Sequence, residues 1–483
     1  MKYLGLLDIT NMEIQDIHIV HFVGIAGVAM TALAVYAKER GMKVTGSDVH
    51  GIFPTRDSLQ RAGITVTDGF SRDHITKHID LVIFTGAHNG KENIEVKTAT
   101  EQNIPVMSHG EALGFFMKGA EQISVAGSHG KTTTSAMIAT IFSVAGRNPS
   151  YAIGCGDIQR LGPSGHFGTG NMFIVEADEY ITDPHHDPKP RFLWQHPDIL
   201  VVTNIDYDHP DAYNSLADVK AAFVTLVSQQ QGRKITILNA DDKESSILTD
   251  APNVVLYGFS PRANACITHV GFGEEQTFFT LSMDGTDVGE FVLHVPGRHN
   301  VLNATAAALC ALSYGLSWDE IKKGLAAFYG TKRRFEKIGE ANNIVVYDDY
   351  AHHPKEITAS LEAARAWFPN RTIITIFQPH TYSRTKALLN DFATCFASSD
   401  VVLLTDIFGS ARETDTLGIT TEKLVEQTAM HHKNVQYTKD KAGTLAYIEK
   451  NVVSGAVIIV MGAGDIYEWG PDIVKQIKKD ANV

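Results

Sequence analysis

The fold of this chain is decided by the stretch Gly127-Ser128-His129-Gly130-Lys131-Thr132-Thr133-Thr134. An apolar run, Ile123 to Ala126, precedes it, and a stretch of helical character follows as far as Gly146. This order predicts a strand, a glycine-rich loop and a helix. In such a unit the backbone N–H groups of the loop converge at the helix start, where the helix dipole adds partial positive charge. The stretch therefore predicts a polyphosphate site, which we interpret as an ATP site.

The side chains of this loop support the same interpretation. Lys131 can reach the outer phosphates, and the Thr132 hydroxyl can ligate Mg²⁺. We expect Lys131 to be exposed and to contribute little to the core. The loop departs from the general G-x-x-x-x-G-K-[ST] pattern, because Val125 stands at the first glycine position, and a helix start without a ligand is the alternative. The residues expected to bind ATP here are Gly127, Ser128, His129, Gly130, Lys131, Thr132 and Thr133.

Length and composition limit the kind of protein. A chain of 483 residues exceeds what one hydrophobic core usually supports, so we expect two to four domains of roughly 100–200 residues. No apolar run approaches the ~20 residues that span a bilayer, and the first residues lack the basic start of a signal peptide. A net charge of −13 without a Lys/Arg-rich block argues against nucleic acid as a partner. We expect a cytoplasmic protein with no membrane partner.

The cysteines give no sign of a disulfide framework or a zinc site. They are far apart and show no Cys-x-x-Cys pairing, which favours free thiols. The four are Cys155, Cys266, Cys310 and Cys395.

The first segment has the order of strands and helices that is typical of a nucleotide-binding unit. A strand over Ile17 to Val23, a glycine turn from Gly24 and a helix to Gly41 predict a βαβ unit. Asp48 follows Gly24 at about the distance, ~20 residues, where a dinucleotide fold keeps its ribose-binding acid. Alanines replace the second and third glycines of that fingerprint, which weakens an NAD interpretation and leaves another nucleotide possible.

In two further segments, expected strands again alternate with expected helices. In the second, strands are expected at Met172 to Val175, Ile199 to Thr203 and Lys234 to Leu238, which predicts a parallel doubly wound sheet. Alternation from Cys266 to Val295 predicts a small antiparallel flap. In the third, strands are expected near Ile344 to Tyr347, Thr372 to Phe377, Val401 to Thr405 and Ala456 to Met461.

Acidic and histidine side chains follow two strands of the second segment. Glu176-Ala177-Asp178-Glu179 comes after the strand ending at Val175, and Asp206 to Asp211 comes after the strand through Thr203. Groups at the carboxyl ends of parallel strands line the ligand crevice. Thr132, Glu176 and His209 are therefore predicted to share one Mg²⁺, which needs few protein ligands. The alternatives are a helix-capping Glu176 and a satisfied loop histidine.

The third segment carries two similar groups. Asp348-Asp349-Tyr350-Ala351-His352-His353-Pro354 follows a strand, and its adjacent histidines favour substrate or nucleotide contact over a zinc site. Phe377-Gln378-Pro379-His380-Thr381-Tyr382-Ser383-Arg384-Thr385 also follows a strand. Arg384 could clamp a phosphate or a carboxylate; a surface Arg384 behind a helix-capping Ser383 is the alternative.

These strings, in this order, resemble the Mur ligases, the ATP-dependent amide-forming enzymes of peptidoglycan assembly, from about His21 to Ile466. Besides the groups above, the resemblance rests on His21-Phe22-Val23-Gly24, Asn204 to His209, Gly297-Arg298-His299-Asn300, Arg333-Arg334-Phe335, Gly409-Ser410-Ala411-Arg412-Glu413 and Gly462-Ala463-Gly464-Asp465.

The resemblance implies an α/β protein of three domains. Residues 1–118 would form a UDP-sugar-binding Rossmann-like domain. Residues 119–333 would form the central ATP-binding domain, a P-loop ATPase with a parallel sheet and a small antiparallel flap. Residues 334–483 would form a C-terminal Rossmann-like substrate-binding domain.

The resemblance also implies a reaction. ATP and Mg²⁺ would activate the carboxylate of UDP-N-acetylmuramate as an acyl phosphate, and L-alanine would displace the phosphate, in a monomer or homodimer. A ligase that recycles a murein tripeptide onto the same sugar is the nearest alternative. An NAD-dependent oxidoreductase and a nucleotide-switch protein are alternatives from other classes.

Residue roles follow from the resemblance position by position. Lys131, His209 and His352 would be catalytic, and Asn300 and Arg334 would bind the nucleotide together with the phosphate loop. The substrate-binding residues would be Gly24, Ala26, Gly27, Asp48, His88, Tyr350, His352 and Arg384. The chain departs from the family pattern at Ser128, at Ala26 and Ala29, and at Thr381, which bears on the contacts with UDP and substrate.

Overall fold

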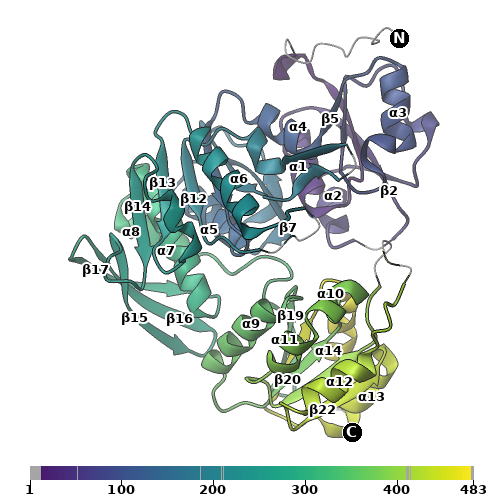
Figure 1. Cartoon of the computed structure of the whole chain (residues 1–483), viewed down its shortest axis with the longest axis vertical. Coiled ribbons are helices and arrows are strands. Elements are labelled where there is room, and N and C mark those ends of the chain that lie inside the picture. Colours follow the sequence, from purple (N-terminus) through teal and green to yellow (C-terminus); the bar gives the residue numbers. More distant parts are fainter. Residues whose placement is uncertain are drawn as a thin grey trace. The chain divides into compact units, whose positions relative to one another are not determined.

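The computed structural model describes residues 12–51, 53–184, 186–207, 209, 212–409, 413 and 415–479. The chain forms two compact units (Figure 1). The first extends from the N-terminal strands to His269 and includes Phe279–Phe291 and Val301–Tyr329. The second comprises Val270–Phe278, Val292–Asn300 and the chain from Gly330 onward.

The first unit opens with a parallel sheet of order β3-β2-β1-β4-β5. Its strands are β1 (Ile19–Val23), β2 (Lys43–Asp48), β3 (Val66–Asp68), β4 (Leu81–Phe84) and β5 (Val106–Ser108). Helices α1 (Val28–Glu39) and α4 (His109–Phe116) cover one face and α3 (Ile94–Glu101) the other, while α2 (Arg56–Arg61) follows β2. The predicted βαβ start is therefore confirmed, and its glycine turn lies at the carboxyl end of β1.

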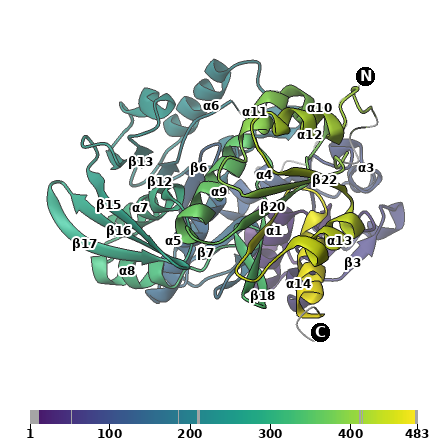
Figure 2. The same ribbon diagram turned by 90° about the horizontal axis from the view of Figure 1, so that it is seen from below.

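A ten-stranded sheet of order β17-β16-β15-β14-β13-β12-β6-β9-β7-β8 follows. Its strands are β6 (Glu121–Ala126), β7 (Ser150–Ile158), β8 (Gly162–His166), β9 (Met172–Ala177), β12 (Ile199–Val202), β13 (Ile235–Asn239), β14 (Val254–Gly258), β15 (Ala265–Gly273), β16 (Gln276–Met283) and β17 (Thr286–Leu293). From β14 to β7 the neighbours run parallel, and β8 is antiparallel to β7. The expected flap is β15 to β17, which continue the sheet at one edge (Figure 2).

Helices of the first unit pack on this sheet. They are α5 (Lys131–Val144), α6 (Leu216–Ser228), α7 (Arg298–Ser313), whose first residues belong to the second unit, and α8 (Trp318–Ala326). Gly324 lets α8 approach α5 closely, because a Cβ there would lie 2.6 Å from Ile141 Cα. A short hairpin, β10 (Ile181–Asp183) and β11 (Asp187–Pro190), leaves the end of the sheet beyond β9. The Tyr36 and Phe173 rings stack at 4.7 Å and join α1 to the central sheet.

The second unit is built on a sheet of order β18-β19-β23-β20-β21-β22, with only β18 antiparallel to its neighbour. The strands are β18 (Glu336–Ala341), β19 (Ile344–Asp349), β20 (Ile373–Phe377), β21 (Val401–Thr405), β22 (Val435–Lys439) and β23 (Val457–Met461). Helices α9 (Pro354–Trp367), α11 (Leu389–Thr394) and α12 (Thr421–Ala429) cover one face. Helices α13 (Lys441–Asn451) and α14 (Trp469–Lys479) cover the other, and the short α10 (Tyr382–Ala387) follows β20.

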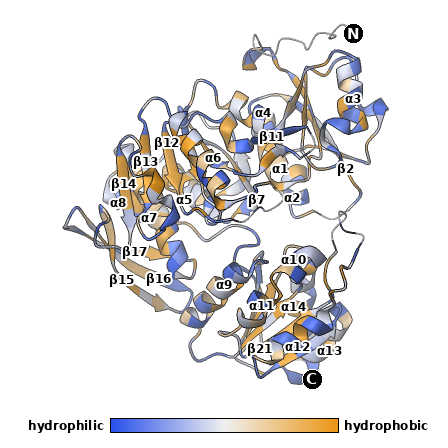
Figure 3. Ribbon diagram, in the orientation of Figure 1, coloured by the Kyte–Doolittle hydropathy of each residue, from blue (hydrophilic) through white to orange (hydrophobic). Residues whose placement is uncertain are grey.

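Side chains that alternate along the strands explain this layering. In β23, Ile459 and Met461 face the α9 side, whereas Ile458 and Val460 face the α14 side. The apolar colouring of Figure 3 accordingly concentrates on the strands. The predicted α/β fold class is confirmed. Among the described residues, no helix is both long and apolar enough to cross a bilayer.

Candidate active site

The phosphate loop joins β6 to α5 as predicted. Gly127 and Gly130 have φ of +136° and +86°, which side chains rarely adopt. A Cβ on Gly130 would also lie 2.6 Å from Asn303 Oδ1. Helix α5 begins at Lys131 without a side-chain cap, so its first N–H groups are suited to an anionic ligand.

The chain that follows β12 holds this loop in place. The His129 N–H donates to Asn204 Oδ1 at 2.9 Å, and the His129 carbonyl accepts from Thr203 Oγ1 at 2.6 Å and from Asn204 Nδ2 at 3.0 Å. The Asp206 N–H donates to Ser128 Oγ at 2.9 Å. The loop is therefore shaped before any ligand arrives, which lowers the ordering cost of binding.

Lys131 is largely buried, whereas we expected it to be exposed. Its Nζ donates to Glu179 Oε2 at 2.8 Å and to the Gly127 carbonyl at 2.5 Å, and its side chain is only 14% exposed. Burial lowers the pKa of Lys131, but the carboxylates of Glu179 and Asp178 outweigh it and raise the pKa. The expectation of an exposed lysine was wrong because a buried carboxylate beside the loop attracts the ammonium group.

The structure brings Thr132 and Glu176 together. Thr132 Oγ1 donates to Glu176 Oε2 at 2.9 Å, and Glu176 Oε1 accepts from the Gly154 N–H at 2.6 Å. Glu176 lies within β9 and not after it, one residue before the strand ends. Burial raises the pKa of Glu176, and Lys131 and Thr132 offset this only in part. A cation bound here would stabilise the carboxylate.

These donors fit a magnesium ion. Hydroxyl and carboxylate oxygens are hard ligands, and Mg²⁺ keeps several waters while taking one or two carboxylates and phosphate oxygens. Within the described part of the chain, no group of three or more His, Cys, Asp and Glu side chains forms a metal site. The Thr132–Glu176 pair would leave the other ligand positions of such an ion to water and phosphate oxygens.

His209 lies beside Glu179. Its ring contacts the Tyr180 ring edge-on at 5.0 Å, and its Nε2 is 3.7 Å from Glu179 Oε1. The predicted trio is thus seen as two pairs, Thr132 with Glu176 and His209 with Glu179. Sequence reasoning quoted Glu179 but gave it no role. The available signal was a second acid three residues after Glu176; its closeness to Lys131 is seen only in the structure. Asp208, Pro210 and Asp211 of the same string lie outside the described residues.

The N-terminal glycine loop is organised by Asp48. Gly24 has φ +83°, and a Cβ there would lie 2.5 Å from Thr85 Cγ2. Asp48 is 1% exposed, and its two carboxylate oxygens accept from the N–H groups of Ala26 and Val49, both at 2.8 Å. His88 Nε2 lies 3.4 Å from Asp48 Oδ1. Asp48 therefore shapes the loop, because each of its carboxylate oxygens accepts from a backbone amide; its contact with a ribose stays a prediction.

Gly27 lies at the start of the helix that follows the glycine turn, and His88 lies after β4. Gly27 is the N-cap of α1 and has no side-chain cap bond, so the helix start is suited to a phosphate. The side chain of His88 is 30% exposed. Contacts of Gly24, Ala26, Gly27 and His88 with a substrate stay predictions.

In the second unit, Tyr350, His352 and Arg334 lie together. His352 Nδ1 is 3.0 Å from the Tyr350 carbonyl and 3.3 Å from Glu356 Oε2. Arg334 lies over the Tyr350 ring at 5.3 Å. Burial, together with Arg384 and Arg334, lowers the pKa of His352 against the opposing charge of Glu356. The imidazole is thus neutral at neutral pH, and since a carbonyl only accepts, its proton is on Nδ1.

Asn300 is part of the turn that starts α7. It is 8% exposed, and its Nδ2 donates to the Pro296 carbonyl at 2.7 Å. Its predicted contact with the nucleotide stays a prediction.

Arg384 lies in α10, whose start is unusual. The helix is capped by Thr381, whose Oγ1 accepts from the Arg384 N–H at 3.4 Å, and not by Ser383 as the alternative had it. Thr381 has φ +69°, a strained conformation for a β-branched residue that is typical of functional loops. Glu413, which sequence reasoning left without a role, accepts from the Tyr382 N–H at 2.6 Å. Ser410, Ala411 and Arg412 lie outside the described residues.

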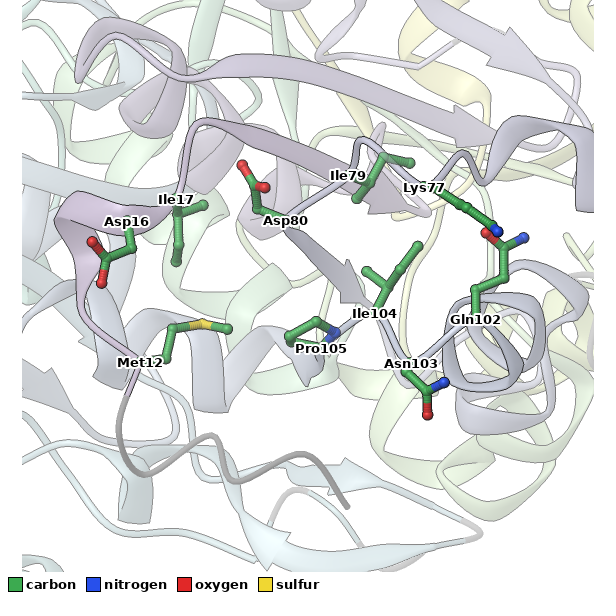
Figure 4. Close-up of a pocket in the computed structure, with 10 residues that line it drawn as sticks. All are labelled: Met12, Asp16, Ile17, Lys77, Ile79, Asp80, Gln102, Asn103, Ile104 and Pro105. Carbon is green, nitrogen blue, oxygen red and sulfur yellow. The ribbon is translucent and has the colours of Figure 1, made fainter. Parts of the chain in front are cut away.

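A cavity of about 520 Å³ lies elsewhere, at the amino ends of the first sheet (Figure 4). It is lined by Ile17, before β1, by Asp80, before β4, and by Ile104 and Pro105, before β5. In a parallel sheet this edge is opposite the glycine loop. None of the predicted site residues lines it.

Comparison with known proteins agrees with this geometry. The profile of the Mur ligase family catalytic domain matches residues 19–121, that of the Mur ligase middle domain residues 125–311, and that of the Mur ligase glutamate ligase domain residues 333–464. The UDP-N-acetylmuramate--L-alanine ligase of Desulfitobacterium hafniense is 38% identical over 92% of this chain and 97% of its own. That of Trichlorobacter lovleyi is 37% identical over 93% and 96%.

Solved structures show the same similarity. The UDP-N-acetylmuramate-alanine ligase of Thermotoga maritima superposes with a TM-score of 0.80 at 27% identity, over 95% of this chain and 99% of its own. The murein peptide ligase of Psychrobacter arcticus shares the fold, with a TM-score of 0.70 at 23% identity over 95% and 99%. With a phosphate loop, a Thr132–Glu176 pair and matches along nearly its whole length, this chain belongs to the Mur ligase family.

Proposed function

We propose that this protein is an ATP-dependent ligase that joins L-alanine to the carboxylate of UDP-N-acetylmuramate in peptidoglycan biosynthesis. The observation that carries the proposal is the preformed phosphate loop with the Thr132–Glu176 pair beside it. The choice of substrates is supported by relatives that carry this activity in their names and match more than nine-tenths of the chain in sequence.

The phosphate loop would bind ATP through the N–H groups at the start of α5. Lys131 would turn from Glu179 to the outer phosphates, and Asn300 and Arg334 would contact the rest of the nucleotide. Thr132, Glu176 and His209 would hold Mg²⁺. When bound, the ion neutralises charge that develops on the transferring phosphoryl group.

The proposed chemistry has two steps. A carboxylate oxygen of the sugar attacks the γ-phosphorus, the bond to ADP breaks, and an acyl phosphate forms. The amino acid arrives as an ammonium ion, and its nitrogen attacks the acyl carbon only after it has lost one proton. The bond to the phosphate oxygen then breaks and a second proton leaves with the phosphate, so that a base is needed for the first proton. His352 is suited to accept that proton at Nε2, because its ring is neutral and its Nδ1 is committed to the Tyr350 carbonyl. His209 is the alternative acceptor.

The remaining assignments are part of the same proposal. Residues 1–118, 119–333 and 334–483 would bind the UDP-sugar, ATP and the second substrate, and the three family matches support these divisions. Gly24, Ala26, Gly27, Asp48 and His88 would form the sugar-nucleotide site, with Tyr350, His352 and Arg384 as the other substrate contacts. A cytoplasmic monomer or homodimer without nucleic acid or membrane partners fits nucleotide substrates.

A competition experiment tests the proposal. The purified protein receives ATP, Mg²⁺ and UDP-N-acetylmuramate with equal L-alanine and L-alanyl-γ-D-glutamyl-diaminopimelate, and the product mass is read. We expect the alanyl product, and phosphate release only when both substrates are present. Preferential tripeptide incorporation would assign the chain to the recycling reaction instead. Phosphate release at the same rate with and without UDP-N-acetylmuramate would contradict a ligase.

A further inference from the structure

Glu179 has a buried oxygen, Oε1, that accepts no hydrogen bond from the described residues. Its side chain is 2% exposed, and Oε2 accepts from Lys131. Among the described residues, no donor reaches Oε1 within hydrogen-bonding distance. His209 Nε2, at 3.7 Å, is too far for a hydrogen bond. A buried carboxylate oxygen left without a donor is costly and calls for a ligand.

The position of Glu179 places this oxygen at the reaction centre. Its backbone is fixed, because the Tyr213 hydroxyl donates to the Glu179 carbonyl at 2.5 Å. The residue follows β9, three positions after Glu176, and Lys131 of the phosphate loop is its ion-pair partner. A group bound to Glu179 therefore lies next to the place where the phosphoryl group is transferred.

The Lys131 ammonium group cannot pair fully with Glu179 and with the nucleotide phosphates at the same time. When its ammonium group turns to the phosphates, the buried carboxylate loses its cation, and an unpaired buried charge is strongly unfavourable. Another cation at this position would stabilise the carboxylate. The amino acid substrate arrives with its amine protonated, so it carries the same kind of group, an ammonium with three donors.

We propose that Glu179 binds the ammonium group of the amino acid substrate, in the place that the Lys131 ammonium occupies when no nucleotide is bound. This rests on the proposed function. Oε1, which accepts no hydrogen bond from the described residues, accepts one N–H of the substrate, and Oε2 accepts a second in place of Lys131. The carboxylate thus keeps one cationic partner before and after nucleotide binding.

The test separates amine binding from acyl-phosphate formation. Glu179→Gln keeps the shape and an oxygen acceptor for Lys131 but removes the charge. L-alanine is one nucleophile, and hydroxylamine is the other. Hydroxylamine is neutral at neutral pH and attacks the acyl carbon, giving a hydroxamate and phosphate without ammonium binding. Asp178→Asn is the matched control, because it removes a neighbouring carboxylate that is paired with Arg191 at 2.8 Å.

We expect Glu179→Gln to raise the KM for L-alanine at least about tenfold, the size expected for a charge-assisted hydrogen bond. Hydroxamate formation with ATP and UDP-N-acetylmuramate should stay within about threefold of the unsubstituted protein, as should the KM for L-alanine in Asp178→Asn. Equal losses with both nucleophiles, or an unchanged KM for L-alanine, would overturn the proposal and leave Glu179 as a support for Lys131. If the unsubstituted protein forms no hydroxamate, the proposed function itself fails.

Discussion

Removing Lys131 should destabilise the protein as well as stop turnover, because its ammonium group neutralises a buried carboxylate. Glu179 is 2% exposed and pairs with Lys131 at 2.8 Å. Breaking a buried ion pair from one side costs about 3–5 kcal/mol. Since the Lys131 side chain is 14% exposed, water can replace part of it. We therefore expect Lys131→Ala to lower the free energy of unfolding by about 2–3 kcal/mol.

A double-mutant cycle in urea measures this. Lys131→Ala, Glu179→Gln and the double variant are compared with the unsubstituted protein, following the transition that includes the first unit. The double variant should regain at least half of the stability lost in Lys131→Ala, because a neutral amide needs no cation. Turnover of Lys131→Ala should fall about 10²-fold or more, through lost stabilisation of the phosphoryl group. A Lys131→Ala protein as stable as the original, or strictly additive effects, would refute the buried ion pair.

Three further outcomes follow from the described contacts. Glu176→Gln and Thr132→Val should each raise the Mg²⁺ concentration needed for half-maximal turnover. If the two residues share one ion, their effects should be non-additive in the double variant, which a magnesium titration measures. Gly130→Ala should raise the KM for ATP, because a side chain at φ +86° costs about 1–2 kcal/mol and the new Cβ meets Asn303 Oδ1; Asn303→Ala should relieve only the steric part. Burial raises the pKa of Asp348 to about 7 from 3.8, so the folded state binds the proton more tightly and stability should fall as pH rises between these values. Asp348→Asn should flatten that dependence in unfolding measured across this range.

The sheets were predictable because their strands are short apolar runs bounded by turn residues. A strand was expected at Val401 to Thr405, and β21 is found there. The hairpin β7–β8 was missed, because its glycines dilute the apolar pattern. The structure gives them a packing role: a Cβ on Gly165 would overlap the Ala32 carbonyl, so the glycine lets β8 lie against α1. Such close approach depends on tertiary contact, which a local pattern does not contain.

The candidate site was predictable where one motif carries it and not where distant segments meet. The phosphate loop could be read directly from Gly127 to Thr134. That Lys131 pairs with Glu179 depends on burial of a carboxylate 48 residues away in sequence. The contacts of Asp48 with the glycine loop also depend on tertiary structure. Spacing identified an acid at the end of β2, but only the structure shows both of its oxygens engaged by backbone amides.

The acyl phosphate is the central claim, and an isotope experiment tests it most directly. UDP-N-acetylmuramate labelled with oxygen-18 in its carboxylate is incubated with ATP, Mg²⁺, L-alanine and the protein, and the inorganic phosphate is analysed by mass. Since a carboxylate oxygen attacks the γ-phosphorus and leaves with it when the amine attacks, we expect each phosphate released to carry one labelled oxygen. Unlabelled phosphate formed in step with the alanyl product would mean that the carboxylate was never phosphorylated, and would contradict the account.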